Sequence, residues 1–288
     1  MKYKITSMQG EVSALIQLME DPDEEIFAHV KQELSRMGDG LIPQLEQYWE
    51  LNQYGPLFHQ RVESLIQELQ YRAIYKRLRE WKESHDQDLL EAMLILNRFA
   101  HPTMAERELK QQVMKIRQDI WLEMNDFLTA VEVINVFNTI LFRVHQFEGV
   151  SHVSQGHNTL GDLLHTKRGE PLILGALYSW IAESLEVQLP AISVPGDCIL
   201  AYQELDYKGG VDNLFYVHPH QGGQIVSREE IEGMLVAMQY PYDDRFFNNA
   251  GRLEWVGRMI NTLINEAIAN SDDKKVSELR AMQALMLE

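Results

Sequence analysis

The chain has 288 residues, of which 45% are hydrophobic, so it can build a substantial core and we expect a folded protein. Its formal net charge of −17 at pH 7 argues against nucleic acids and anionic membrane surfaces as partners, because their phosphates would repel it. Cys198 is the only cysteine, which excludes an intramolecular disulfide and a zinc site built from several cysteines.

The first 150 residues are predicted to form one helix after another. Apolar residues recur at helical spacing from Val12 to Met19, and Asp21-Pro22-Asp23 is typical of a bend followed by a helix N-cap. Gly38 is expected to end the second helix. This helix pair resembles a HEAT-type repeat, and one such unit must pack on neighbouring helices to bury both of its faces. Further helices are predicted at 41–51, 56–82, 89–99, 105–124 and 127–147.

The pattern changes at Phe147-Glu148-Gly149, after which Gly, Ser, His and Asn dominate as they do in loops. A short helix is predicted at 160–167 and a longer one at 171–187. Strands are predicted at 191–194, 198–204 and 214–218, and Gly222-Gly223 is expected to turn the chain into a strand at 224–226. Ser227 to Glu230 has the pattern of a capping box that opens a helix to residue 239. Amphipathic helices are predicted at 252–270 and 274–287.

Five segments, in this order, resemble the transglutaminase-like superfamily, and within it the bacterial branch similar to the Sir B-type regulators. They read Phe-Glu-Gly-Val at 147–150, Asn-Thr-Leu at 158–160, Arg-Gly-Glu-Pro-Leu-Ile-Leu at 168–174, Pro-Gly-Asp-Cys-Ile-Leu at 195–200 and His-Pro-His-Gln-Gly-Gly at 218–223. With the helical pattern, the resemblance implies an α+β protein that is mostly helical. A HEAT-like helical region at 1–150 is expected to pack on a degenerate transglutaminase-like, papain-type domain with a small antiparallel sheet at 151–250, and C-terminal helices at 251–288 should pack back onto it.

The catalytic residues of the superfamily are missing or exchanged in this sequence. Papain-type chemistry needs a thiolate at a helix N-terminus, an imidazole to activate it and a carboxylate or amide to orient that imidazole. The resemblance places the nucleophile near Pro171, where the sequence Gly169-Glu170-Pro171 offers neither Cys nor Ser. The family histidine falls on Asp197, the aromatic residue after it on Cys198, and the family aspartate or asparagine on His218. Histidine and aspartate have therefore exchanged places between two adjacent strands.

We accordingly predict a non-catalytic pseudoenzyme that acts as a binding or regulatory module, with a protein as its partner and without a cofactor. Asp197 and His218 are expected to face each other across neighbouring strands and to fasten the sheet. HEAT-like helices commonly present a protein-binding surface, which by analogy supports this role. The candidate binding residues are Asp197, Cys198, His218, His220, Glu170 and Asn158.

The first alternative is a papain-type cysteine hydrolase or acyltransferase with Cys198 as nucleophile, His218 as base and Asp197 as the orienting acid. Against it, the carboxylate next to the thiol would raise the thiol pKa. Successive residues of a strand also point to opposite faces, so Asp197 and Cys198 are not expected to face His218 together.

The second alternative is a metal site. His218 and His220 are two residues apart on an extended segment and would share a face, where Asp197 offers a third ligand. His152, His157 and His165 are more distant candidates. Finally, no stretch approaches the roughly 20 apolar residues that span a bilayer and no apolar signal segment opens the chain, so we expect a cytoplasmic protein, with its oligomeric state left open.

Overall fold

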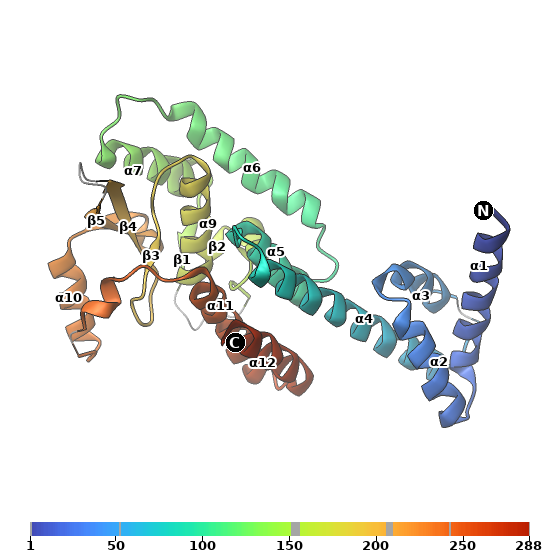
Figure 1. Cartoon of the computed structure of the whole chain (residues 1–288). Coiled ribbons are helices and arrows are strands. Elements are labelled where there is room, and N and C mark those ends of the chain that lie inside the picture. The colour runs from blue at the N-terminus through green and yellow to red at the C-terminus, as the bar shows by residue number, and fades with distance from the viewer. Residues whose placement is uncertain (1, 52, 151–155, 206–209, 242, 288) are drawn as a thin grey trace. The chain divides into compact units, whose positions relative to one another are not determined.

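The structure, a computed structural model, describes residues 2–51, 53–150, 156–205, 210–241 and 243–287. The chain divides into two compact units, Met1–Arg79 and Glu80–Glu288. Most of the described residues are helical, and their strands form a four-stranded sheet and a two-stranded pair (Figure 1). The prediction of a mostly helical protein with a small antiparallel sheet is confirmed. The HEAT-like repeat and the domain limits at residues 150 and 250 stay predictions.

The first unit consists of helices whose ends follow the capping signals in the sequence. Its elements are α1 (Lys2–Gln17), the short turn η1 (Leu18–Glu20), α2 (Glu24–Arg36), the turn η2 (Asp39–Leu41), α3 (Ile42–Trp49) and α4 (Pro56–Glu83) as far as Arg79. Asp23 is the N-cap of α2, as predicted, and its carboxylate accepts a hydrogen bond from the amide of Glu25 at 2.8 Å. The apolar faces of these helices meet in a core that includes Ile16, Leu34 and Leu65.

A buried arginine fastens α4 to the bend between α1 and α2. The side chain of Arg61 is only 6% exposed, and its guanidinium donates to the carbonyl oxygens of Met19 and Asp21 and to the carboxylate of Glu24. The same group lies 4.0 Å from the ring centroid of Phe27. These contacts satisfy two carbonyl groups, one within η1 and one just after it, that lie beyond the end of α1.

The second unit opens with helices and continues into the sheet. Its elements before the sheet are α5 (Leu89–Ala100), α6 (Glu106–Glu123), α7 (Ala130–Asn138), η3 (Thr139–Val144), β1 (Glu148–Gly149), α8 (Leu160–Thr166), β2 (Arg168–Gly169) and α9 (Pro171–Ser184). The single helix predicted at 127–147 is wrong at its start and in its second half. A capping box between Thr129 and Glu132 begins α7 at Ala130, and from Thr139 the chain is a wider π-helix.

The sheet has the order β3-β4-β5-β6, and each neighbouring pair is antiparallel. Its strands are β3 (Ala191–Ile192), β4 (Ile199–Leu205), β5 (Val211–His218) and β6 (Gln224–Val226). The elements that follow are α10 (Arg228–Ala237), the turn η5 (Asp244–Phe247), α11 (Arg252–Ala269) and α12 (Asp273–Leu287). Leu200 in β4 pairs with Val217 in β5, which fixes the register beside the candidate site. Ile199, Tyr216 and Ile231 belong to a core that joins the sheet to α10.

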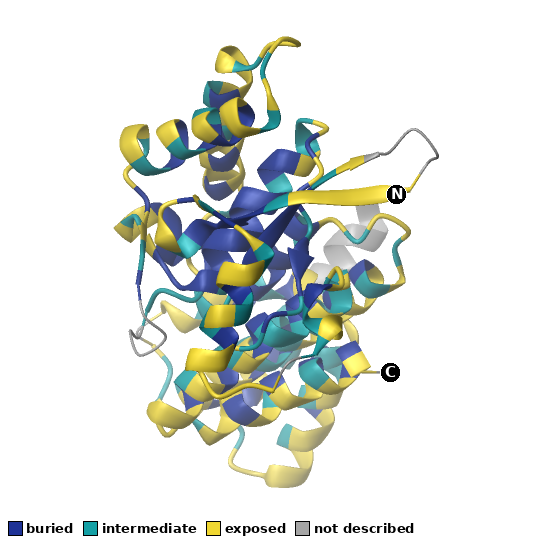
Figure 2. Cartoon of the chain, turned by 90° about the vertical axis from the view of Figure 1, so that its left-hand side faces the viewer, coloured by how far each residue is buried: buried dark blue, intermediate teal, exposed yellow. Residues whose placement is uncertain are grey.

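Helix α9 is buried along nearly its whole length, in keeping with its continuously apolar sequence from Leu172 to Tyr178. Figure 2 shows the buried residues of the second unit gathered in its interior and the exposed ones on the outer turns of its helices. Because packing on most sides holds α9 in place, the residues at its start are held in place as well. In the part of the chain that the structure describes, no helix combines the length and apolarity needed to cross a bilayer.

Candidate functional site

Asp197 and His218 meet at one end of the sheet. Because Leu200 pairs with Val217, the residues just before β4 lie beside the last residue of β5. Oδ2 of Asp197 is 2.9 Å from Nε2 of His218, whose side chain is 1% exposed. Burial alone would raise the pKa of the Asp197 carboxyl, but His218, the Cys198 amide and the charge of His220 outweigh it and lower that pKa below its usual value. Asp197 and His218 are thus in direct contact.

His220 joins this pair from the turn η4 (Pro219–Gln221). Its Nε2 lies 2.9 Å from the carbonyl oxygen of Val150, and its ring centroid is 6.1 Å from that of His218. The approach requires glycine at position 149, because a Cβ there would lie 2.4 Å from Cδ2 of His220 and 2.3 Å from its carbonyl oxygen. Ligand-type atoms of Asp197, His218 and His220 all lie within 4.8 Å of one another.

Cys198 does not take part in this contact group with its thiol. The side chain is 1% exposed, and burial raises the pKa of the thiol to about 12, with Arg258 opposing the shift and Asp197 adding to it. A Cβ on Gly175 would lie 2.3 Å from the Cys198 sulfur, so the thiol fills the space beside α9 that this glycine leaves. Gly175 lies one turn beyond Pro171, and the thiol therefore packs in the core beside α9 rather than at its first residue.

A residue with a carboxylate side chain immediately precedes α9. Glu170 is the N-cap residue, with Pro171 at the first helical position, and its side chain is 3% exposed. Its backbone amide donates to the carbonyl oxygen of His157 at 3.1 Å.

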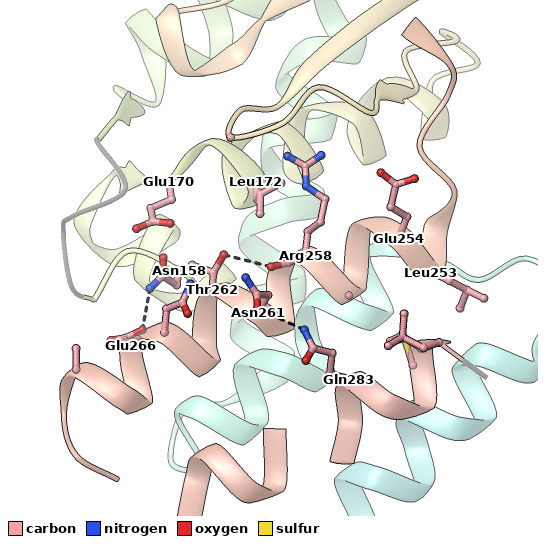
Figure 3. Close-up of a pocket in the computed structure, with 16 residues that line it drawn as sticks. Asn158, Glu170, Leu172, Leu253, Glu254, Arg258, Asn261, Thr262, Glu266 and Gln283 are labelled. Atoms are coloured by element: carbon pink, nitrogen blue, oxygen red, sulfur yellow. Dashed lines mark hydrogen bonds between the residues drawn. The ribbon is translucent and has the colours of Figure 1, made fainter. Parts of the chain in front are cut away.

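A cavity of ≈ 1040 Å³ opens between the start of α9 and helices α11 and α12. Asn158, Glu170 and Leu172 line one side, and α11 contributes a polar face to the other (Figure 3). The charged lining residues are Glu170, Glu254, Glu266 and Arg258.

Hydrogen bonds hold the cavity walls in place. Asn158 donates from Nδ2 to Oε2 of Glu266 at 2.8 Å, which joins the loop before α8 to α11 (Figure 3). Arg258 donates to the carbonyl oxygens of Val194 and Asp197, at 3.1 Å and 2.5 Å. Its guanidinium thus braces the backbone of the Asp197 segment against α11, and its charge is shared with two carbonyl groups.

The six candidate binding residues fall into three places. Asn158 and Glu170 line the cavity, Asp197, His218 and His220 form the contact group at the sheet end, and Cys198 is in the core. Sequence reasoning missed the cavity face of α11. The signal was present in the polar residues Glu254, Arg258, Asn261 and Asn265, whose spacing of four, three and four places them along one helical face.

The more distant histidines have local partners. Nδ1 of His157 lies 3.4 Å from the hydroxyl of Thr166, and Nδ1 of His165 lies 3.1 Å from the carbonyl oxygen of Gly161. Neither belongs to the group formed by Asp197, His218 and His220. His152 lies outside the described residues.

A comparison of the sequence with known protein families gives one match. The transglutaminase-like superfamily matches residues 104–261, more than half of the chain. The chain belongs to the transglutaminase-like superfamily. Searches of curated proteins and of solved structures find no match. The family match includes α9, the sheet and the first half of α11, and therefore both the sheet-end contact group and most of the cavity.

Proposed function

We propose that this transglutaminase-like protein is a non-catalytic binding module, and that its cavity receives a basic segment of a partner protein. The observation that carries the proposal is the exchange at the start of α9. The resemblance puts the nucleophile near Pro171, where the chain has Glu170 and Pro171, and the chain's only cysteine is buried with a thiol pKa of about 12. A neutral, enclosed thiol is a poor nucleophile.

The charge of the cavity indicates what it binds. Three carboxylates, from Glu170, Glu254 and Glu266, line it together with the guanidinium of Arg258, which already contacts two carbonyl oxygens. The chain as a whole carries a formal net charge of −17, so long-range attraction also favours a cationic partner. A lysine or arginine side chain from a partner fits this surface through charge-assisted hydrogen bonds.

A peptide-binding experiment tests the proposal. Fluorescent pentalysine is titrated with the full chain at physiological salt, with pentaglutamate as the probe of opposite charge. The Glu254→Gln/Glu266→Gln variant is expected to bind pentalysine about tenfold more weakly, since the exposed carboxylate of Glu254 and the partly exposed one of Glu266 each contribute up to about 1 kcal/mol. The matched control is Glu108→Gln/Glu123→Gln, which removes the same charge from the exposed face of α6. Equal weakening by both pairs would show attraction to net charge alone and would overturn the assignment of the cavity.

The competing candidate is a papain-type hydrolase or acyltransferase that uses Cys198. It is less favoured because the thiol would have to leave its position beside Gly175 before it met a substrate. The contact between Asp197 and His218 resembles part of a catalytic triad, but in this protein it lacks a described serine or cysteine hydrogen-bonded to the imidazole.

Three finer assignments accompany the proposal. The order of the five segments around residues 147–223 supports membership of the Sir B-type branch. The helix pair that bends at Asp21-Pro22-Asp23 supports a HEAT-like region that contributes protein-binding surface. The acidic composition supports a cytoplasmic protein with no affinity for nucleic acid or membrane.

A further inference from the structure

We propose that Asp197, His218 and His220 bind a divalent transition-metal ion, with Zn²⁺ as the ion whose chemistry they fit best. This site is separate from the carboxylates assigned to the peptide-binding cavity, and the two proposals can fail independently. It uses two imidazoles and one carboxylate, a donor set that zinc and its neighbours in the first transition series prefer over Mg²⁺ and Ca²⁺.

The orientation of His220 makes one of its nitrogens available as a ligand. A carbonyl oxygen only accepts hydrogen bonds, so the contact of 2.9 Å between Nε2 of His220 and Val150 places the ring proton on Nε2. Nδ1 is the ring nitrogen that this contact leaves for a metal ion. A backbone carbonyl that holds the far nitrogen of a histidine is the usual outer-shell partner at metal sites, where it fixes the tautomer and the ring orientation.

In Asp197, as in His220, one side-chain atom contacts a backbone group and another remains for a metal ion. Its Oδ1 accepts a hydrogen bond of 2.7 Å from the amide of Cys198, which leaves Oδ2 to face His218. The side chain is 14% exposed, so the carboxylate is reachable from solvent. A carboxylate with one oxygen anchored to the backbone is held in place for coordination through the other.

His218 supplies the independent observation that points to a ligand. Its side chain is 1% exposed, and among the described residues neither ring nitrogen has a hydrogen-bond partner. Nε2 nevertheless lies 2.9 Å from Oδ2 of Asp197. Two such groups, close together but without a hydrogen bond between them, can both ligate a cation at a common centre. A cation at that centre would satisfy the buried imidazole.

The spacing is compatible with one ion. Zinc binds nitrogen and carboxylate oxygen at about 2.0–2.2 Å, so neighbouring ligands of a tetrahedral site lie about 3.4 Å apart. One ligand-type atom from each of the three residues lies within 4.8 Å of the other two, and the side chain of His220 is partly exposed. Three protein ligands leave a fourth position for water or a bound group.

The test is calorimetric titration of Zn²⁺ into the full chain, purified without a polyhistidine tag and treated with chelator. We expect one equivalent to bind and the melting temperature to rise, while Mg²⁺ does neither. Co²⁺ should give the visible absorption bands of a nitrogen-ligated ion. His220→Ala and Asp197→Asn are each expected to lower Zn²⁺ affinity at least about tenfold. His165→Ala, which removes an exposed histidine of the same unit, should bind as the wild type does.

The outcomes separate cleanly. Failure of the wild type to take up Zn²⁺ overturns the proposal. Uptake that is equally strong in His220→Ala and Asp197→Asn also overturns it, because the ion would then bind elsewhere. His220 is partly exposed and lies outside the hydrophobic core, so its replacement should leave the far-ultraviolet circular dichroism of the metal-free chain unchanged and keep the comparison valid even where a His218 variant fails to fold.

Discussion

The reactivity of Cys198 offers the sharpest test of the non-catalytic assignment. Burial raises the pKa of its thiol to about 12 from an ordinary value of 9.0, a difference of about 3 (12 − 9.0). At a pH below both pKa values, each unit by which the thiol pKa is raised lowers the thiolate fraction tenfold. At neutral pH the native chain therefore holds about a thousandfold less thiolate than the same thiol in water. Only the thiolate reacts with iodoacetamide. We therefore expect native alkylation to be about a thousandfold slower than alkylation of the unfolded chain, and slower still because the sulfur is enclosed.

The assay is incorporation of iodoacetamide followed by intact-mass spectrometry, in native buffer and in guanidinium chloride at the same pH. Cys198→Ala provides the blank, since the chain has no other cysteine. The native rate should rise about tenfold for each unit of pH, because the thiolate fraction does so below the thiol pKa. A native rate within about tenfold of the unfolded rate, or one that levels off near neutral pH, would refute the reasoning and favour the hydrolase.

Three further predictions concern stability. Gly175→Ala should lower the free energy of unfolding by about 1–3 kcal/mol in urea titrations, because its methyl group would overlap the Cys198 sulfur. Adding Cys198→Ala should restore part of the lost stability. No recovery in the double variant would contradict the packing of Gly175 against Cys198. Arg61→Ala should cost about 3 kcal/mol in the first unit, since it leaves buried carbonyl oxygens without donors, and a cost below about 1 kcal/mol would show that they find water instead. The side-chain hydrogen bond to Asp162 raises the pKa of His101. Burial alone would raise the pKa of Asp162, but the interactions with His101 and Thr159 outweigh burial and lower the pKa of Asp162. The contribution of His101 to the free energy of unfolding is complete below pH 6.5 and is lost as the pH rises through the raised pKa of His101. The contribution of Asp162 is complete above pH 3.8 and is lost as the pH falls through the lowered pKa of Asp162. His101→Gln should therefore destabilise the chain more at pH 5 than at pH 8.5, and an equal loss at both would argue against the ion pair.

Local features of the sequence determined most of the secondary structure. Asp23 at the start of α2 and the capping box from Ser227 to Glu230 at the start of α10 both function as predicted. Such signals succeed because a cap and a helical stripe involve residues within four positions of one another, where chain connectivity already imposes the contact. A local pattern could not reveal that the single helix predicted at 127–147 changes into a π-helix after α7, because the apolar residues recur without a break across that change.

The sequence also shows that no thiol begins α9, and its resemblance to the superfamily predicts that Asp197 and His218 are exchanged. Only the tertiary structure decided what those residues contact. The register of β4 and β5 set Asp197 against His218, the close approach at Gly149 brought in His220, and Gly175 enclosed the Cys198 thiol in the core. The cavity likewise depends on α11, which lies far along the chain from α9. These contacts join segments that no local pattern relates, because they arise when distant apolar faces are buried together.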